Sequence, residues 1–206
     1  MLIHKGAKYS IHADGVEAVK TDGVTRRTMK FYPERDASAI AGDIDELTAW
    51  QILHDIAGDA QKLTTPIAPK HILIDGTHFV LSEWSEGHDE RLTAPEGYSA
   101  VWALAASVFY LFLGCHVFQG LGGKGQRQMT PIPTLRRQLP ELSKLLIRCL
   151  EYDVSLRPSL IEIQQEAEGN IIRCESLQSE FPPHKVSDSE PLTADELDLV
   201  WSDEFC

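Results

Sequence analysis

Histidine, cysteine and serine form few of the patterns that catalysis or metal binding requires in this chain. The eight histidines lack the spacing of metal ligands, apart from a loose pair, His78 and His88, followed by Asp89 and Glu90. We interpret that group as part of a solvated loop. The four cysteines stand singly, without C-x-x-C spacing, and no G-x-S-x-G motif supports a serine nucleophile. The sequence therefore predicts no cofactor, no metal site and no covalent catalysis.

The composition limits the class of protein further. The chain has 206 residues, of which 43% are hydrophobic and 24% charged, a balance typical of a folded globular protein. Its formal net charge of −12 repels nucleic acid and anionic lipid, and no basic patch overrides that charge. The N-terminus lacks the layout of a signal peptide, and the scattered cysteines favour reduced thiols. These features predict a cytoplasmic protein that binds neither nucleic acid nor membranes, and they leave its oligomeric state open.

The elements that must position any site begin with short β-forming runs separated by Asp-Gly pairs. Such pairs at 14–15 and 22–23 are strong signals for two-residue hairpins. We therefore expect a three-stranded meander near the N-terminus. Its strands cover residues 9–13, 16–21 and 24–32. A further hairpin is expected at 71–81, HILIDGTHFVL, turning on Asp75-Gly76.

Helical patterns dominate between these strands and residue 174. A capping box formed by Asp43 and Glu46 predicts a helix that ends near Leu63. Pro140 suits the first turn of another helix, which carries an amphipathic stripe of leucines. A last helix is expected to begin at Ser159, where Glu162 completes a capping box, and to end at 169–170, Gly-Asn.

The segment 101–118 contains eighteen residues without a formal charge. By length alone it fits a transmembrane span, but a helix that is buried on all sides has the same apolar composition. The polar residues Ser107 and His116 and the glycine-rich sequence that follows favour the buried helix.

The C-terminal segment 175–206 differs in composition from the rest of the chain, with nine acidic residues against one basic residue, Lys185. Its prolines and low hydrophobicity predict a linker, and Thr193 with Glu196 then forms a capping box. Four apolar residues share one face of the short acidic helix that follows: Leu197, Val200, Trp201 and Phe205. This face packs either on its own domain or in a groove of a protein partner.

The order of several motifs resembles the helical C-lobe of eukaryotic-type protein kinases. IAPKHILID (67–75) is similar to the catalytic-loop frame, and FVLSEW (79–84) to the strand that leads into the metal-binding Asp-Phe-Gly motif. Ala94-Pro95-Glu96 repeats the Ala-Pro-Glu motif of the family. Two longer segments resemble the buried central helix and the closing helix pair with its Arg-Pro: YSAVWALAASVFYLFLG (98–114) and LLIRCLEYDVSLRPS (145–159). The resemblance implies a structural ion pair between Glu96 and Arg157.

The same resemblance implies that the chemistry of phosphoryl transfer is lost. Pro66 stands where kinases have the catalytic aspartate, and proline can neither accept a proton nor orient a hydroxyl. His71 replaces the asparagine that binds Mg²⁺, an ion that prefers oxygen ligands. Glu83 replaces the aspartate of Asp-Phe-Gly and could still bind a cation. Ala100 replaces the aspartate that tethers the catalytic loop, so the resemblance implies that this loop has lost its tether.

The N-terminal part departs further from the kinase pattern. RTMKFY (27–32) is similar to the third strand, which places Lys30 at the phosphate-binding lysine, although we favour the interpretation of Lys30 as a solvent-facing lysine on a strand. No G-x-G-x-x-G motif is present to cover phosphates. Between Tyr32 and Asp43 there is no room for the regulatory helix of the family or for the strands that hold adenine.

We therefore expect an α+β, protein-kinase-like fold in three parts. A reduced N-lobe covers 1–40, a mainly helical C-lobe 41–174, and the acidic tail 175–206. The resemblance implies a pseudokinase, a catalytically inactive scaffolding module that docks a protein partner, with the tail as its docking element. The alternative is a divergent protein kinase or other ATP-dependent transferase that uses Glu83 for the metal and Lys30 for phosphate.

Overall fold

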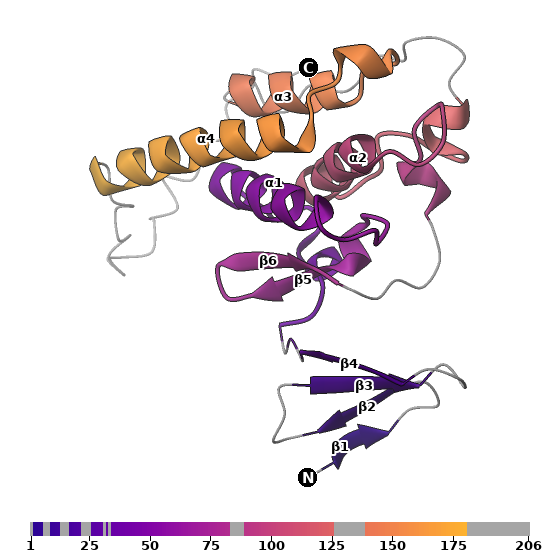
Figure 1. Cartoon of the computed structure of the whole chain (residues 1–206). Coiled ribbons are helices and arrows are strands. Elements are labelled where there is room, and N and C mark those ends of the chain that lie inside the picture. The colour runs from indigo at the N-terminus through magenta and orange to yellow at the C-terminus, as the bar shows by residue number, and fades with distance from the viewer. Residues whose placement is uncertain are drawn as a thin grey trace, which may run out of the picture. The chain divides into compact units, whose positions relative to one another are not determined.

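The protein combines an N-terminal β-sheet with a mainly helical body, as a computed structural model shows (Figure 1). This arrangement confirms the predicted α+β class. The structure describes residues 32, 34–82, 89–125 and 139–180, and the backbone of four strands that lie before them. Two units can be distinguished along the chain, 1–175 and 176–206.

The N-terminal sheet is antiparallel, and its strand order follows the chain. Its strands are β1 (Leu2–Lys5), β2 (Tyr9–His12), β3 (Glu17–Thr21) and β4 (Arg26–Lys30). The last three confirm the predicted strands. The prediction of a three-stranded meander was nevertheless wrong, because β1 adds a fourth strand. The short connection between β1 and β2 contains no Asp-Gly pair, so the hairpin signal used for the other strands was missing.

Helix α1 (Glu46–Ala60) is amphipathic and forms the centre of the body. It buries Trp50, Ile52, Leu53 and Ile56 completely. The predicted cap was misplaced: the N-cap is Asp45, whose carboxylate accepts a hydrogen bond from the Thr48 amide at 2.8 Å. The capping box predicted for Asp43 and Glu46 was wrong, because Glu46 is the first residue of the helix and not the third. The helix also ends earlier than predicted, before Leu63.

The predicted hairpin is present as β5 (Ile72–Asp75) and β6 (His78–Leu81). Asp75 pairs with His78, so the turn lies at 76–77 and not at the predicted 75–76. Gly76 adopts a φ of +65° that favours glycine. Strand β6 packs on α1 (Figure 1).

Two carboxylates of α1 accept hydrogen bonds from backbone amides along the outer edge of β6. Asp55 accepts a hydrogen bond from the Phe79 amide at 3.0 Å, and Asp59 accepts one from the Leu81 amide at 2.9 Å. Residues four apart on a helix are separated by about 6 Å along its axis. Amides two apart on a strand are separated by about 6.6 Å. This match lets α1 cover the strand edge with side chains in place of a third strand.

Helix α2 (Ala100–Leu113) is the most deeply buried element of the body. It ends at Gly114, which has a φ of +71°, so it is shorter than the predicted 101–118 segment. Its burial on nearly all sides confirms the second of the two alternatives drawn from the sequence. Among the described residues, no helix combines the length and apolar character that crossing a bilayer requires.

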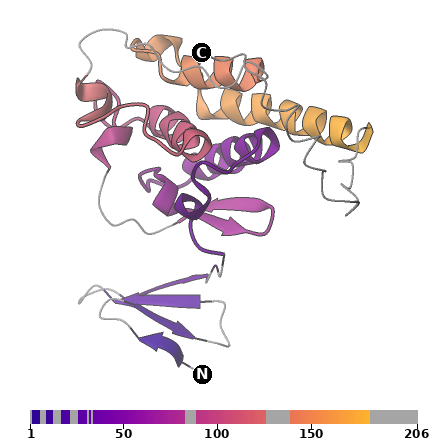
Figure 2. The same ribbon diagram turned by 180° about the vertical axis from the view of Figure 1, so that it is seen from behind.

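The last two helices are α3 (Pro140–Cys149) and α4 (Leu160–Glu180). The predicted capping box of α4 is confirmed, since Ser159 donates its amide to Glu162 at 2.8 Å and Glu162 donates its amide to the Ser159 hydroxyl at 3.2 Å. Helix α1 lies between the β5–β6 hairpin and the N-terminal part of α4 in both views of the ribbon (Figures 1 and 2).

The predicted end of α4 at 169–170 was wrong, because the helix continues through Gly169 and Asn170. Cys174 beyond that point is 93% buried by the rest of the fold, with 7% of its surface exposed, and Arg173 forms an ion pair with Glu46 of α1 at 2.6 Å. These tertiary contacts favour helix where the local Gly-Asn signal favours an end. Residues 175–180 are therefore helical, and the predicted linker does not begin at 175.

Candidate functional site

The loop before the hairpin, residues 64–71, is where the resemblance to kinases would place the catalytic loop. Pro66 lies in its extended part, and His71 ends a short 3₁₀ turn at 69–71. His71 is 4% exposed, and its Nδ1 lies 2.6 Å from the Pro66 carbonyl oxygen. The His71 carbonyl accepts a hydrogen bond from the Ser82 amide at 2.8 Å. His71 thus joins this loop to the hairpin and has a structural role there.

The tether of this loop differs from the expectation. Ala100 offers no polar side chain, but the Ile67 amide donates a hydrogen bond to the Tyr98 hydroxyl at 3.1 Å. The inference that the loop has lost its tether was therefore wrong. The sequence carried no signal for Tyr98, because the contact joins residues 31 positions apart. Burial raises the pKa of the Tyr98 phenol, and the phenol remains neutral around pH 7.

The ion pair between Glu96 and Arg157 is present. Nη2 of Arg157 lies 3.0 Å from one carboxylate oxygen of Glu96, and Nη1 lies 2.5 Å from the other. The hydrogen bonds from Arg157 lower the pKa of Glu96, so the carboxylate is charged at neutral pH. The pair connects the segment before α2 with the loop between α3 and α4.

Arg157 makes two further contacts that the sequence did not predict. Its Nε donates to the Glu151 carbonyl oxygen at 2.6 Å, and its guanidinium carbon lies 5.0 Å from the ring centre of Trp102. Only 3% of the Arg157 side chain is exposed, against 38% for Glu96. The arginine is thus the fixed member of the pair and the glutamate is its solvent-facing partner.

Two glycines of the sequence after α2 hold the Ala-Pro-Glu segment from its other side. The Gly123 amide donates to the Thr93 carbonyl at 2.7 Å. A side chain at Gly123 would meet Pro95 at 2.7 Å, and one at Gly122, which has a φ of +60°, would meet the Glu90 carbonyl oxygen at 2.4 Å. This close approach requires glycine at both positions.

Other predicted site residues lie where the structure gives less information. Lys30 is the last residue of β4 and pairs with Glu17 of β3 in the sheet register. Glu83 and His88 fall outside the described residues. So does the apolar face of the tail, Leu197, Val200, Trp201 and Phe205. In the described part of the chain, no three residues of the metal-ligating types gather into a group that could hold an ion.

The arrangement of the loop 64–71 limits what it can do chemically. It contains no carboxylate, and its histidine is buried with one ring nitrogen directed at a backbone carbonyl. General base catalysis from this loop would require a group that can reach a substrate hydroxyl.

No known family model matches the chain, and no curated protein matches it either.

Proposed function

We propose that the chain is a protein-kinase-like pseudokinase that acts as a protein-binding module. The observation that carries this proposal is the Glu96–Arg157 pair, in which the Ala-Pro-Glu segment contacts the Arg-Pro loop as the resemblance implies. The order of elements around it supports the same assignment. A helix, a hairpin, the Ala-Pro-Glu segment, a buried helix and a closing pair of helices follow one another, as in a kinase C-lobe.

The chemistry of the loop 64–71 supports a non-catalytic role. The position of the catalytic base holds Pro66, and His71 is engaged in the fold. The scaffold contacts are retained, since Tyr98 holds the loop in place of the missing aspartate. A protein-binding module requires the folded framework, but it does not require the groups that transfer a phosphoryl group.

The acidic tail is the proposed docking element for the partner. Residues 175–206 carry nine acidic residues and one basic residue, with four large apolar residues on one helical face. An amphipathic helix of this type binds by placing its apolar face in a groove, and its acidic face favours a basic rim on the partner. The proposed partner is therefore a protein with an apolar groove and basic edges.

Removing residues 181–206 tests this role and keeps helix α4 complete. We expect the melting temperature to change by less than about 2 °C, because a tail that docks on a partner adds little to the stability of its own domain. Crosslinking in cells, with a photoreactive group at Ser202, should yield a discrete adduct that Trp201→Ala abolishes. A large drop in melting temperature on truncation, without a Trp201-dependent adduct, would instead show that the tail packs on its own domain.

A further inference from the structure

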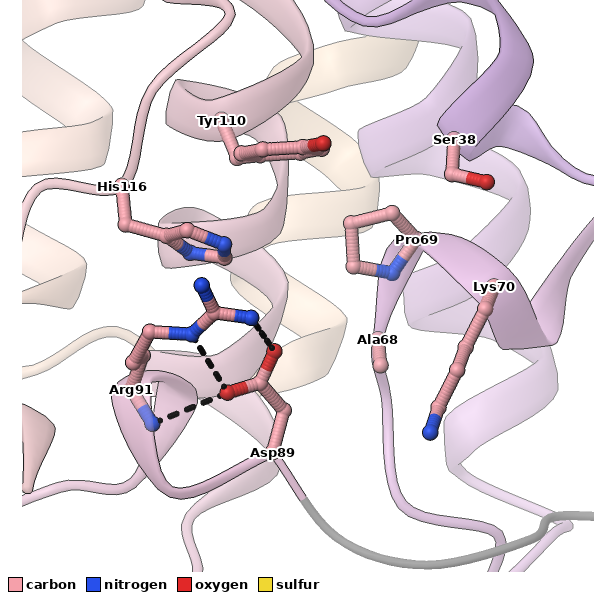
Figure 3. A pocket seen from close by; sticks show the side chains of 8 residues that line it. All are labelled: Ser38, Ala68, Pro69, Lys70, Asp89, Arg91, Tyr110 and His116. Atoms are coloured by element: carbon pink, nitrogen blue, oxygen red, sulfur yellow. Dashed lines mark hydrogen bonds and ion pairs between the residues drawn. The ribbon is translucent and has the colours of Figure 1, made fainter. Parts of the chain in front are cut away.

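A polar cavity of about 220 Å³ lies beside the C-terminal end of α2 (Figure 3). Its polar lining comes from separate segments of the chain. Ser38 lies in the 3₁₀ turn before α1, Lys70 in the loop before the hairpin, Arg91 before α2, and Tyr110 and His116 at the end of α2 and just beyond it. Pockets for drug-sized ligands are usually larger, about 300 to 1,000 Å³, so the cavity suits a small polar group.

Asp89 fixes the orientation of Arg91 at one wall of the cavity. The carboxylate accepts hydrogen bonds from Nε of Arg91 at 3.0 Å and from Nη2 at 2.9 Å. It also accepts one from the Arg91 backbone amide at 3.1 Å. Nη1 has no hydrogen-bond partner among the described residues, and 46% of the Arg91 side chain is exposed. The guanidinium is therefore oriented in advance and keeps a donor for a ligand.

His116 lines the cavity, and one of its ring nitrogens has no hydrogen-bond partner among the described residues. Its ring stacks on Tyr110, with ring centres 4.4 Å apart, and Figure 3 shows it between Tyr110 and the guanidinium of Arg91. Its Nδ1 is buried and has no hydrogen-bond partner within the described part of the chain. A buried, unpaired ring nitrogen is costly, and a ligand that accepted a hydrogen bond from it would remove that cost.

Among the described residues, the charged side chains that line the cavity have a formal net charge of the opposite sign to that of the whole chain. Lys70 and Arg91 bring two positive charges and Asp89 one negative charge, which leaves a formal charge of +1 in a chain of −12. Burial lowers the pKa of His116, Arg91 lowers it further and Asp89 raises it, so the ring is neutral around pH 7. An anion in the cavity would shift this balance and raise the pKa of His116.

We propose that this cavity binds a phosphate group, either of a phosphate monoester or of the free ion, through Lys70, Arg91 and His116. Lys70 lies across the cavity from Arg91, so the nitrogen donors face a ligand from different sides (Figure 3). The hydroxyls of Ser38 and Tyr110 add further polar groups to the lining. A tetrahedral phosphate presents three free oxygens to such a ring of donors, whereas a planar carboxylate presents two. The proposal does not require the pseudokinase assignment, because it uses none of the degenerate catalytic positions.

The test is an NMR titration of the full-length protein that follows the ring proton of His116. The probes are inorganic phosphate, capped O-phosphoserine and capped glutamate, at a constant ionic strength of about 0.15 M to hold screening fixed. We expect both phosphate probes to move the His116 signal saturably and to raise its pKa, while the signals of His54 and His78 on the hairpin side of α1 stay in place. Capped glutamate should move His116 at least tenfold less effectively.

Lysine variants separate a built site from general attraction between charges. Lys70→Ala should weaken phosphate binding about tenfold, the loss expected when one charge-assisted hydrogen bond is removed. Lys62→Ala is the matched control, because Lys62 is an exposed lysine outside the cavity. Arg91→Lys keeps the charge and tests the oriented fork, and it should also weaken binding. Melting temperatures of all variants in phosphate-free buffer establish that they are folded.

Three results would overturn the proposal. One is the absence of a saturable shift at His116, and another is an equal loss of affinity in Lys70→Ala and Lys62→Ala. Equal effects of capped glutamate and capped phosphoserine would refute the choice of phosphate. Within the expected result, tighter binding of capped phosphoserine than of inorganic phosphate identifies a phosphorylated side chain as the source. The reverse order identifies the free ion.

Discussion

Replacing Arg157 should destabilise the protein through more than its ion pair. The side chain donates two hydrogen bonds to Glu96 and one to the Glu151 carbonyl, and it lies against Trp102. A net hydrogen bond is worth about 1 kcal/mol, and a cation–π contact about 0.5 to 2 kcal/mol. Because Glu96 is 38% exposed, water screens the charge pair and its share is discounted. We expect Arg157→Ala to lower the free energy of unfolding by about 2 to 4 kcal/mol and Glu96→Gln by about 1 kcal/mol.

Urea denaturation of a double-mutant cycle on Glu96 and Arg157 measures the coupling between them, for which we expect about 1 kcal/mol. The pair of Arg148 on α3 and Glu166 on α4 is a matched control, with an N–O distance of 3.1 Å and side-chain exposures of 41% and 30%. Its arginine is far less buried than Arg157, so its coupling should not exceed about 0.5 kcal/mol. Equal coupling energies in the two cycles, or equal losses for Arg148→Ala and Arg157→Ala, would refute the structural role of the Glu96–Arg157 pair.

The pH dependence of this pair has a definite sign. Because Arg157 lowers the pKa of Glu96 in the folded protein, the carboxylate stabilises the fold above its unfolded pKa of about 4.3. The contribution is lost as the pH falls through the folded pKa. The difference in stability between the wild type and Glu96→Gln should therefore be constant near pH 7 and decrease in acid. A difference that grew in acid would contradict the assignment.

Three further predictions follow from particular contacts. Gly169→Ala should raise the free energy of unfolding by about 0.5 to 1 kcal/mol, because Gly169 lies inside α4 with open space around it; a loss of stability would indicate a helix end there. Asp59→Ala should cost about 1 to 3 kcal/mol by leaving the Leu81 amide unpaired, and Asp59→Asn, which keeps an acceptor, should cost less; equal costs would argue against the hydrogen bond. Burial raises the pKa of Cys149 to about 12, so at pH 8 an alkylating reagent should label the exposed Cys115 and spare Cys149 in the folded protein, as mass spectrometry would show; fast labelling of Cys149 would contradict its burial.

The sequence predicted the elements whose signals are local. The Ser159–Glu162 box, the turn at Gly76 and the buried character of α2 all depend on neighbouring residues, and all three are present. The predictions were wrong where tertiary contacts determine the local structure. Helix α4 passes through Gly169 because residues beyond it pack on α1, which no local pattern reports.

In the candidate site, too, the sequence predicted some contacts and missed those that depend on the tertiary fold. The Glu96–Arg157 pair was expected because the resemblance to kinases links two distant motifs. The hydrogen bond from Ile67 to Tyr98 was not, since a tyrosine has many possible partners and only the fold selects one. The cavity beside α2 could not be predicted, because its lining comes from segments that are far apart in the chain.

A thermal-shift titration with ATP and Mg²⁺ or Mn²⁺ tests the central claim, that the chain is a pseudokinase without transfer chemistry. A ligand at a hundred times its dissociation constant adds about 2.7 kcal/mol, which corresponds to roughly 5 to 10 °C for a domain of this size. We predict no metal-dependent shift at millimolar nucleotide for the wild type, Glu83→Ala or Lys30→Ala. The variant Lys70→Ala identifies any shift that comes from phosphate in the cavity beside α2. A metal-dependent shift that Glu83→Ala or Lys30→Ala abolishes and Lys70→Ala preserves would contradict the account and favour a divergent ATP-dependent enzyme.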